Sequence, residues 1–207
     1  MMNAFFNEKN WKNIEYVGFD LDGTLYDEYE FIYQVYSEIN KKFLHNQKAL
    51  EFMLRRWMEK GSSYPYIFEE TYLSFIKKEE GLEDFLKNTL KIYRNFYPKL
   101  HLAARTKFLL EYFGNNYCLF LITDGNCSLQ KNKYNALGLF DYFSKENTVF
   151  TGCYGSNYVK PNSEVIHLIE HIDPKRSIFF GDRDIDEKFA ERTNMRFVKV
   201  YNMVEIR

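Results

Sequence analysis

The sequence has few cysteines, almost no net charge and no long run of apolar residues. Its 207 residues carry 28 basic and 29 acidic side chains, so electrostatics gives no reason to expect a nucleic acid or a membrane surface as a partner. No stretch approaches the roughly 18 apolar residues that a membrane-spanning helix needs. Internal repeats and low-complexity linkers are also lacking. These absences leave the broad class of globular domains.

The three cysteines, Cys118, Cys127 and Cys153, are an odd number and do not have the spacing of metal ligands. This usage favours a reducing compartment over a disulfide framework. The first residues contain no basic region followed by an apolar run, so no signal peptide is expected. We therefore expect a soluble, cytoplasmic protein.

Apolar and aromatic residues, in contrast, are abundant. Hydrophobic residues make up 45% of the chain, which includes 20 Phe and 17 Tyr. This is enough for a sizeable core, in which aromatic side chains contribute much of the packing energy. The length fits one domain, or one domain that carries a smaller insertion.

Short apolar segments alternate with helical ones in the second half of the chain. Together with a segment near the start, the predicted strands are 14–19, 117–123, 148–151, 177–180 and 196–201. The predicted helices between them are 103–113, 127–137, 163–172 and 184–193. Such alternation predicts a parallel sheet that is covered by helices on both faces. The expected fold class is therefore α/β, with a Rossmann-like doubly wound sheet.

Residues 28–100 have helical rather than strand character. Apolar side chains recur there at every fourth position, as expected for one face of a helix, at Phe31, Val35, Ile39 and Phe43 and again at Leu50, Leu54 and Met58. Two further helices are expected over 66–79 and 83–96. We predict an α/β core made of residues 1–27 and 101–207, interrupted by a helical insertion over residues 28–100.

Polar side chains follow four of the predicted strands. In chain order these are Asp20 and Asp22, then Thr123, then Lys160, and finally Asp182, Asp184 and Asp186. Because ligands of doubly wound sheets bind beyond the carboxyl ends of the strands, we expect these groups to converge. Several carboxylates in one small site repel each other unless a cation joins them, and carboxylate oxygens suit Mg²⁺ beside a phosphate. With a Thr and a Lys opposite the metal, the site suits a transferred phosphoryl group.

In this order, the segments resemble the four motifs of the haloacid dehalogenase superfamily of phosphohydrolases. The matching segments are Phe19–Leu25, Leu121–Asn126, Lys160–Pro161, which is expected to open a helix, and Gly181–Asp186. The resemblance covers about residues 14–201. The helical insertion has the position and size of that family's small helical cap. The segment between Thr123 and Lys160 is too short for the larger cap of other branches.

The resemblance implies a magnesium-dependent phosphatase that acts through an aspartyl-phosphate intermediate. Asp20 would be the nucleophile, and Asp22 the general acid and then the general base. Mg²⁺ would bind the Asp20 carboxylate, the Asp22 carbonyl and Asp182. The implied substrate is a small phosphorylated metabolite, whose identity the cap sequence does not reveal.

The resemblance also implies a set of phosphate-binding groups, namely Thr123, Lys160 and the amide of Asp124. Asp186 would lie outside the metal's direct ligands and hold a metal-bound water or Lys160. Asp184 competes with Asp186 because the fourth motif allows both spacings, and we favour Asp186.

Other interpretations of the same residues remain open. Each motif alone has a structural explanation, such as an acidic turn at Asp20 or a helix start at Asp182. A calcium loop is excluded because Leu25 stands where that loop requires glycine. Within the superfamily, Asp22 speaks against dehalogenases and phosphonate-cleaving enzymes, which lack this second acid.

A phosphomutase remains the enzymatic alternative. That branch carries a His ten residues beyond the second acid, where this sequence has Ile32, so hydrolysis is favoured. A non-catalytic relative that accepts a phosphoryl group or binds a ligand is the other alternative. In the cap, Arg55, Arg56 and Lys60 suggest a second anion site, but a solvated helix face is the preferred explanation.

Overall fold

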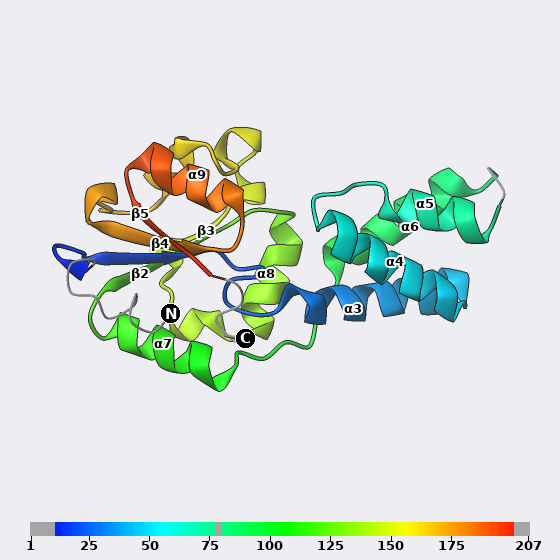
Figure 1. Ribbon diagram of the computed structural model, residues 1–207, viewed down its shortest axis with the longest axis horizontal. Helices are drawn as coiled ribbons and strands as arrows, with labels where there is room; N and C mark the ends of the chain where they lie inside the picture. Colours follow the sequence, from blue (N-terminus) through cyan, green and yellow to red (C-terminus); the bar gives the residue numbers. More distant parts are fainter. Residues whose placement is uncertain (1–10, 78–79, 201–207) are drawn as a thin grey trace. The chain divides into compact units, whose positions relative to one another are not determined.

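The computed structural model describes residues 11–77 and 80–200 (Figure 1). The chain divides into two compact units. One runs up to Asp27 and resumes at His101, and the other comprises Glu28–Leu100. None of the helices in this described part of the chain has the length and apolar character that a membrane span requires.

The first unit is built on a five-stranded parallel sheet with the strand order β3-β2-β1-β4-β5. Its strands are β1 (Tyr16–Phe19), β2 (Cys118–Thr123), β3 (Thr148–Phe150), β4 (Ser177–Gly181) and β5 (Arg196–Lys199). In the register of the sheet, Phe19 lies opposite Leu121 on one side and Phe180 on the other. All neighbouring strands run parallel, so their carboxyl ends meet at one edge of the sheet.

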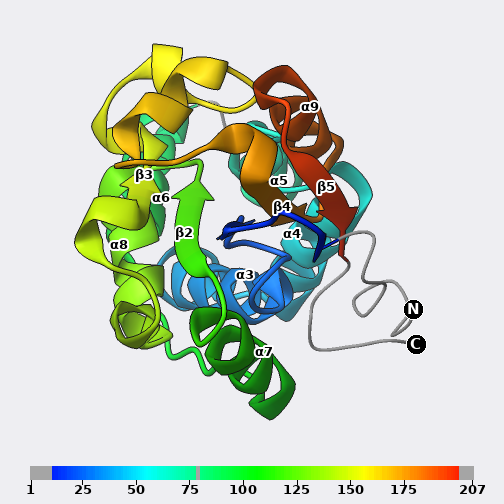
Figure 2. The ribbon, with the colours of Figure 1, turned by 90° about the vertical axis from the view of Figure 1, so that its left-hand side faces the viewer.

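Helices cover both faces of this sheet, and α7 and α9 lie on opposite sides of it in both views (Figures 1 and 2). The helices of this unit are α7 (Ala104–Gly114), α8 (Cys127–Ala136), α9 (Asp184–Thr193) and several short 3₁₀ helices. Successive strand residues point to opposite faces. Accordingly, Phe179 packs on Phe189 of α9, with ring centroids 5.2 Å apart, and Phe180 packs on Phe113 of α7 at 5.7 Å. The α/β doubly wound fold predicted from the sequence is confirmed.

The described residues of the second unit form helices joined by short connections. Its helices are α3 (Glu28–Ile39), a π-helix η1 (Asn40–Leu44), α4 (Gln47–Lys60), α5 (Ile67–Phe75) and α6 (Leu82–Asn95). Phe31, Val35 and Ile39 are buried, as their four-residue spacing predicts. A π-helix has more residues per turn than an α-helix, so the four-residue spacing does not continue through η1. Phe43, which lies in η1, is therefore only half-buried.

The predicted helix over 163–172 is wrong in type and in extent. The structure has a 3₁₀ helix, η6 (Ser163–Leu168), which begins after Asn162, whose side chain accepts a hydrogen bond from the Glu164 amide. It therefore begins beyond Lys160–Pro161, where the helix was expected to open. Ile169 is already extended. His171, which lies inside the predicted range, has φ +57°, a left-handed conformation that a right-handed helix does not contain.

Cys127 and Cys153 form a disulfide, and Cys118 is free and exposed. The expectation that no disulfide forms is therefore wrong. The bond joins the first residue of α8 to the 3₁₀ helix η4 (Thr151–Cys153), which follows β3. The two cysteines are 26 residues apart in sequence, and they meet because β2 and β3 are neighbours in the sheet.

Candidate active site

Asp20 is the first residue after β1, and its side chain is fully buried. Its amide donates a hydrogen bond to the Phe180 carbonyl in β4, so strand pairing continues up to the site. Its Oδ1 accepts a hydrogen bond from Lys160 Nζ at 2.6 Å, whereas its buried Oδ2 has no hydrogen-bond partner among the described residues. Burial raises the pKa of Asp20 to about 7, although the Lys160 ammonium acts in the opposite direction.

The loop after Asp20 contains a glycine that the geometry requires. Gly23 has φ +73°, in the left-handed region that favours glycine. A Cβ at this position would lie 2.4 Å from Asp182 Oδ2. The absence of a side chain therefore lets the loop pass directly against the carboxylate that follows β4.

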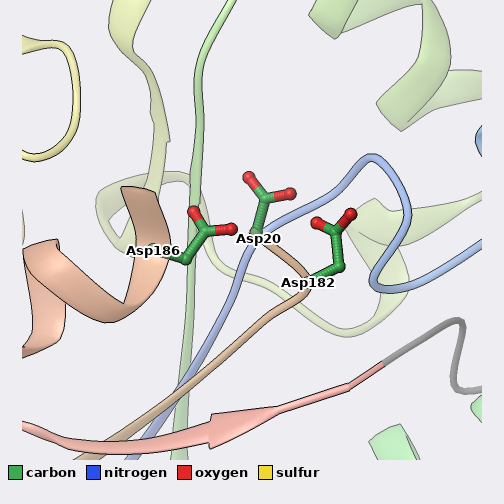
Figure 3. A group of neighbouring side chains, drawn as sticks. All are labelled: Asp20, Asp182 and Asp186. Carbon is green, nitrogen blue, oxygen red and sulfur yellow. The ribbon is translucent and has the colours of Figure 1, made fainter. Parts of the chain in front are cut away.

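Three carboxylates, those of Asp20, Asp182 and Asp186, form one group (Figure 3). Each offers one oxygen atom, and these atoms lie within 4.8 Å of one another. Burial raises the pKa of Asp182 to about 6, and its Oδ1 is buried without a hydrogen-bond partner in the described chain. Buried carboxylate oxygens that lack hydrogen bonds are unfavourable unless a cation binds them. The oxygen donors and their unmet hydrogen bonds fit a divalent metal such as Mg²⁺.

Lys160 neutralises part of this group. Its ammonium donates to Oδ1 of Asp20 and Oδ1 of Asp186, each at 2.6 Å, and to the Ile122 carbonyl at 3.3 Å. An ammonium has three N–H groups, so all of its donors are used. Burial lowers the pKa of Lys160, but the two carboxylates raise it by more, so the pKa lies above its ordinary value.

The two acids of the fourth motif between which the sequence left a choice lie in different surroundings. Asp186 is fully buried, contacts Lys160, and accepts a hydrogen bond from the Arg183 amide through its Oδ2. Asp184 is exposed and pairs with Lys199 at 2.6 Å. Asp186 therefore belongs to the carboxylate group and Asp184 does not.

Asp22 lies in a different environment, because three side chains donate to its carboxylate. Oδ1 accepts from the Tyr26 hydroxyl at 2.5 Å and from Lys133 Nζ at 2.7 Å, and Oδ2 accepts from Gln130 Nε2 at 2.7 Å. Burial raises the pKa of Asp22, but the Lys133 charge and these hydrogen bonds outweigh it and lower the pKa below its ordinary value. Of the two acids in this loop, Asp22 therefore has more of its negative charge offset by neighbouring donors than Asp20 has.

Thr123 and Asp124 end β2 and begin the turn into α8. Thr123 Oγ1 is buried and lies 2.7 Å from Gln130 Nε2. Asp124 Oδ1 accepts hydrogen bonds from Thr151 Oγ1 at 2.8 Å and from the Lys160 amide at 3.2 Å. The Asp124 carboxylate therefore holds the segment that carries Lys160, and the binding of phosphate by its amide stays a prediction.

Three residues of the site, Gln130, Lys133 and Arg183, were not predicted from the sequence. Leu129 of α8 and Leu137, the residue that follows the helix, mark its buried side, and Lys133 lies midway between them. A lysine at such a position calls for a buried anionic partner, and this signal was available in the sequence. Arg183 directly follows Asp182, and its guanidinium lies 4.0 Å from both Asp20 and Asp182.

Arg55 and Arg56 of the helical unit have local partners. Arg56 donates to both oxygens of Glu70, at 2.7 and 2.8 Å, and to Glu59 at 2.9 Å. Arg55 lies 3.9 Å from Glu59. These ion pairs match the solvated helix face that was the preferred explanation of this cluster.

A model of the haloacid dehalogenase-like hydrolase family matches residues 17–200. The chain belongs to the haloacid dehalogenase-like hydrolases. The match includes every strand of the sheet except the first residue of β1, as well as the whole helical unit between β1 and β2. By sequence, none of the curated proteins matches this chain.

Solved structures of other family members share this fold. A HAD-superfamily hydrolase of subfamily IA, variant 1, from Geobacter sulfurreducens PCA is 21% identical, with a TM-score of 0.67 over 90% of this chain and 87% of that one. A haloacid dehalogenase-like family protein from Streptococcus pneumoniae is 20% identical, with a TM-score of 0.61 over 94% and 88%. The protein YfnB from Bacillus subtilis, in a form bound to magnesium, is 14% identical, with a TM-score of 0.60 over 89% and 87%. The family and the helical insertion predicted from the motifs are therefore confirmed.

Proposed function

We propose that this haloacid dehalogenase-like hydrolase is a magnesium-dependent phosphatase of small phosphomonoesters, with Asp20 as its nucleophile. The observation that carries the proposal is the state of the Asp20 carboxylate. One oxygen is bound by Lys160, and the other is buried without a hydrogen bond inside a group of three carboxylates. This arrangement suits a carboxylate that shares its charge with a cation and attacks phosphorus.

The reaction would proceed in two half-reactions. Asp20 attacks the phosphorus atom, the bond from phosphorus to the leaving oxygen breaks, and the protonated form of Asp22 gives that oxygen a proton. Because the donors around Asp22 outweigh its burial and lower its pKa, this protonated form is the minor one near neutral pH. Water then attacks the phosphorus of the aspartyl-phosphate and gives a proton to Asp22, which releases phosphate and restores Asp20. Two acids separated by one residue in a loop can serve one substrate in this way.

Mg²⁺ would be held by the Asp20 carboxylate, the Asp22 carbonyl and Asp182, with Asp186 outside the direct ligands. When bound, the metal supplies positive charge that offsets the charge of the carboxylates and of the phosphoryl oxygens. Gly23 supports this assignment, because the lack of a side chain lets the loop lie against Asp182.

Thr123, the Asp124 amide and Lys160 would bind the phosphoryl oxygens. Lys160 has no N–H to spare without ligand, so substrate binding requires that it exchange one of its hydrogen bonds. The bond to the Ile122 carbonyl is the longest of the three, at 3.3 Å. It is the one we expect to be replaced by a phosphoryl oxygen.

Hydrolysis is favoured over phosphoryl transfer to a second sugar position. The mutase branch carries a His where this chain has Ile32, and Ile32 is fully buried. An isoleucine cannot exchange protons, which supports water as the acceptor. We further propose that the helical unit Glu28–Leu100 acts as the cap that selects the substrate, as the resemblance to the small-cap branch implies.

The test is a panel of phosphomonoesters assayed with Mg²⁺ and with EDTA. We expect turnover that requires Mg²⁺ and that Asp20→Asn abolishes, while the exposed acid variant Asp184→Asn keeps wild-type turnover. If Asp20→Asn keeps wild-type turnover, or if EDTA changes nothing, the proposed mechanism is wrong. A phosphorylated Asp20 that forms but does not hydrolyse would instead identify a phospho-accepting protein.

A further inference from the structure

Two side chains of α8, Gln130 and Lys133, donate hydrogen bonds to the carboxylate of Asp22, one to each of its oxygens. Lys133 Nζ lies 2.7 Å from Oδ1, and Gln130 Nε2 lies 2.7 Å from Oδ2. Residues three apart on a helix lie on the same face, so one helix face presents a charged donor and a neutral donor together. A carboxylate bound at both oxygens has little freedom to rotate.

The burial of these two side chains shows that this contact is built into the fold. Lys133 is 2% exposed and Gln130 is 1% exposed. Lysine is almost never buried without an anionic partner, because the loss of hydration strongly disfavours an isolated charge. The ion pair with Asp22, whose side chain is 14% exposed, meets this requirement.

Gln130 also connects Asp22 to the end of the neighbouring strand. Its Nε2 lies 2.7 Å from Asp22 Oδ2 and 2.7 Å from Thr123 Oγ1. One carboxamide thus links the loop after β1 to the predicted phosphate-binding hydroxyl at the end of β2. Any shift of α8 would therefore change the position of Asp22 relative to Thr123.

The helix that carries both residues is anchored at its first turn. The Asn126 side chain accepts a hydrogen bond from the Leu129 amide at 3.2 Å, and Cys127 is disulfide-bonded to Cys153. A capped and covalently tied helix start restricts the movement of the turns that follow it. Gln130 and Lys133 lie on the first two turns after this anchor.

We propose that Lys133 and Gln130 are positioning residues that orient the Asp22 carboxylate for proton transfer. The inference rests on the proposed phosphatase function and deepens it, because it explains how one carboxylate is kept in place for two successive proton transfers. Neither residue needs to touch the substrate. Their loss affects the steps that depend on Asp22 and spares nucleophilic attack by Asp20.

The first experiment compares the two half-reactions in Lys133→Met and Gln130→Met, with wild-type protein and Mg²⁺. The substrate is an aryl phosphate whose phenolate leaves without a proton, so that its release in the first turnover does not need Asp22. We expect first-turnover phenolate release within about threefold of wild type, whereas steady-state turnover, which includes adduct hydrolysis, falls by about tenfold to a hundredfold. Lys131→Met is the matched control, because Lys131 is an exposed lysine of the same helix.

The second experiment is a double-mutant cycle that combines Lys133→Met with Asp22→Asn. If Lys133 acts through Asp22, the double variant is no slower than Asp22→Asn alone. The double variant also lacks the unpaired buried charge that Lys133→Met creates. It and the neutral change Gln130→Met therefore decide the question even if Lys133→Met does not fold.

The outcomes separate this inference from the proposed function. Wild-type protein that turns over no phosphomonoester with Mg²⁺ overturns the proposed function, and the inference with it. Active wild-type protein with unimpaired Lys133→Met and Gln130→Met overturns the inference alone. Equal losses in first-turnover release and steady state, or losses that add to that of Asp22→Asn, also overturn it, because they indicate a merely structural role.

Discussion

Two buried lysines, Lys160 and Lys133, each bind one acid of the same loop. The pKa values of these two acids are nevertheless shifted in opposite directions. Around Lys160, the carboxylates of Asp20 and Asp186 share one ammonium. Around Asp22, one carboxylate receives Lys133 and two neutral donors. Burial raises the pKa of Asp20 to about 7, whereas the donors around Asp22 outweigh its burial and lower its pKa.

The difference supports the proposal that these two carboxylates, separated by one residue, have separate roles. The Asp20 side of the site has too little positive charge, which explains why it fits a divalent cation. The Asp22 side has enough donors of its own and needs no cation at its carboxylate. Neighbouring side chains, rather than the identity of the acids, make this distinction.

The largest expected effect is the loss of activity when either acid is replaced. Asp20→Asn removes the proposed nucleophile and should lower kcat by about 10⁴-fold or more. Asp22→Asn removes only proton transfer and should lower kcat by about 10²–10⁴-fold, with accumulation of phosphorylated enzyme. Steady-state kinetics and acid-quench labelling measure both, with Asp184→Asn as the control. Rapid adduct hydrolysis in Asp22→Asn would remove Asp22 from the acid and base role.

The next effect compares the two lysines by stability. Lys160→Met leaves two buried carboxylates without their shared cation and should cost about 3–5 kcal/mol in the absence of metal. Lys133→Met should cost less, because Gln130 and Tyr26 still donate to Asp22. Urea unfolding in EDTA measures both free energies. A larger loss for Lys133→Met would reverse the comparison between the two sites.

The pH dependence should also differ between the two sides of the site. Asp20 and Asp182 have folded-state pKa values of about 7 and about 6, above their ordinary value of 3.8. The folded protein then binds more protons than the unfolded chain, so this contribution to stability is present below pH 4 and is lost as the pH rises to about 7. For Asp22, whose pKa is lowered, the contribution is present above pH 4 and is lost as the pH falls.

Mg²⁺ should offset the loss at higher pH, because metal binding requires deprotonated carboxylates. At a hundredfold excess over its Kd, it should stabilise the protein by about 3 kcal/mol at pH 8, and by less at the same concentration at pH 5. Urea unfolding at several pH values, with EDTA or with Mg²⁺, measures the difference. An equal gain at both pH values in wild-type protein would contradict a metal site formed by Asp20 and Asp182.

The smallest effect compares the helix caps of the two units. Asn126 caps α8 and Asn46 caps α4, each through a side-chain oxygen that accepts a backbone N–H. Replacement by Ala should cost about 0.5–2 kcal/mol at either cap. Only Asn126→Ala should also slow turnover, because α8 carries Lys133 and Gln130. Equal kinetic losses in Asn46→Ala would show that turnover responds to stability in general.

Much of the α/β core could be predicted from local sequence patterns. Asp20, Thr123 and Asp182 were placed at one edge of the sheet because each lies at the end of an apolar strand, and parallel strands end at the same edge. The helical unit followed from the four-residue spacing of residues such as Phe31 and Val35. Both signals depend only on residues that are close in the chain.

The elements that the sequence did not predict depend on contacts between distant segments. The disulfide between Cys127 and Cys153 requires β3 to lie beside β2. The residue at which η6 ends depends on the difference in free energy between the helical and the extended conformation of the chain there. The preference for Asp186 over Asp184 was stated from the fourth motif, but what separates the two acids in the structure is the rotation of α9 about its axis. A shift of two residues turns a side chain by about half a helical turn, which places Asp186 on Lys160 and Asp184 on Lys199.

The sequence by itself determined which chemical groups follow β1, β2 and β4, and these groups define the phosphohydrolase-like loop that contains Asp20 and Asp22. Only the tertiary structure decided what surrounds each of the two acids. The reason is that a carboxylate's charge state depends on burial and on donors within hydrogen-bonding distance. The donor to Asp20 is Lys160. Asp22 receives donors from α8, which lies more than 100 residues further along the chain.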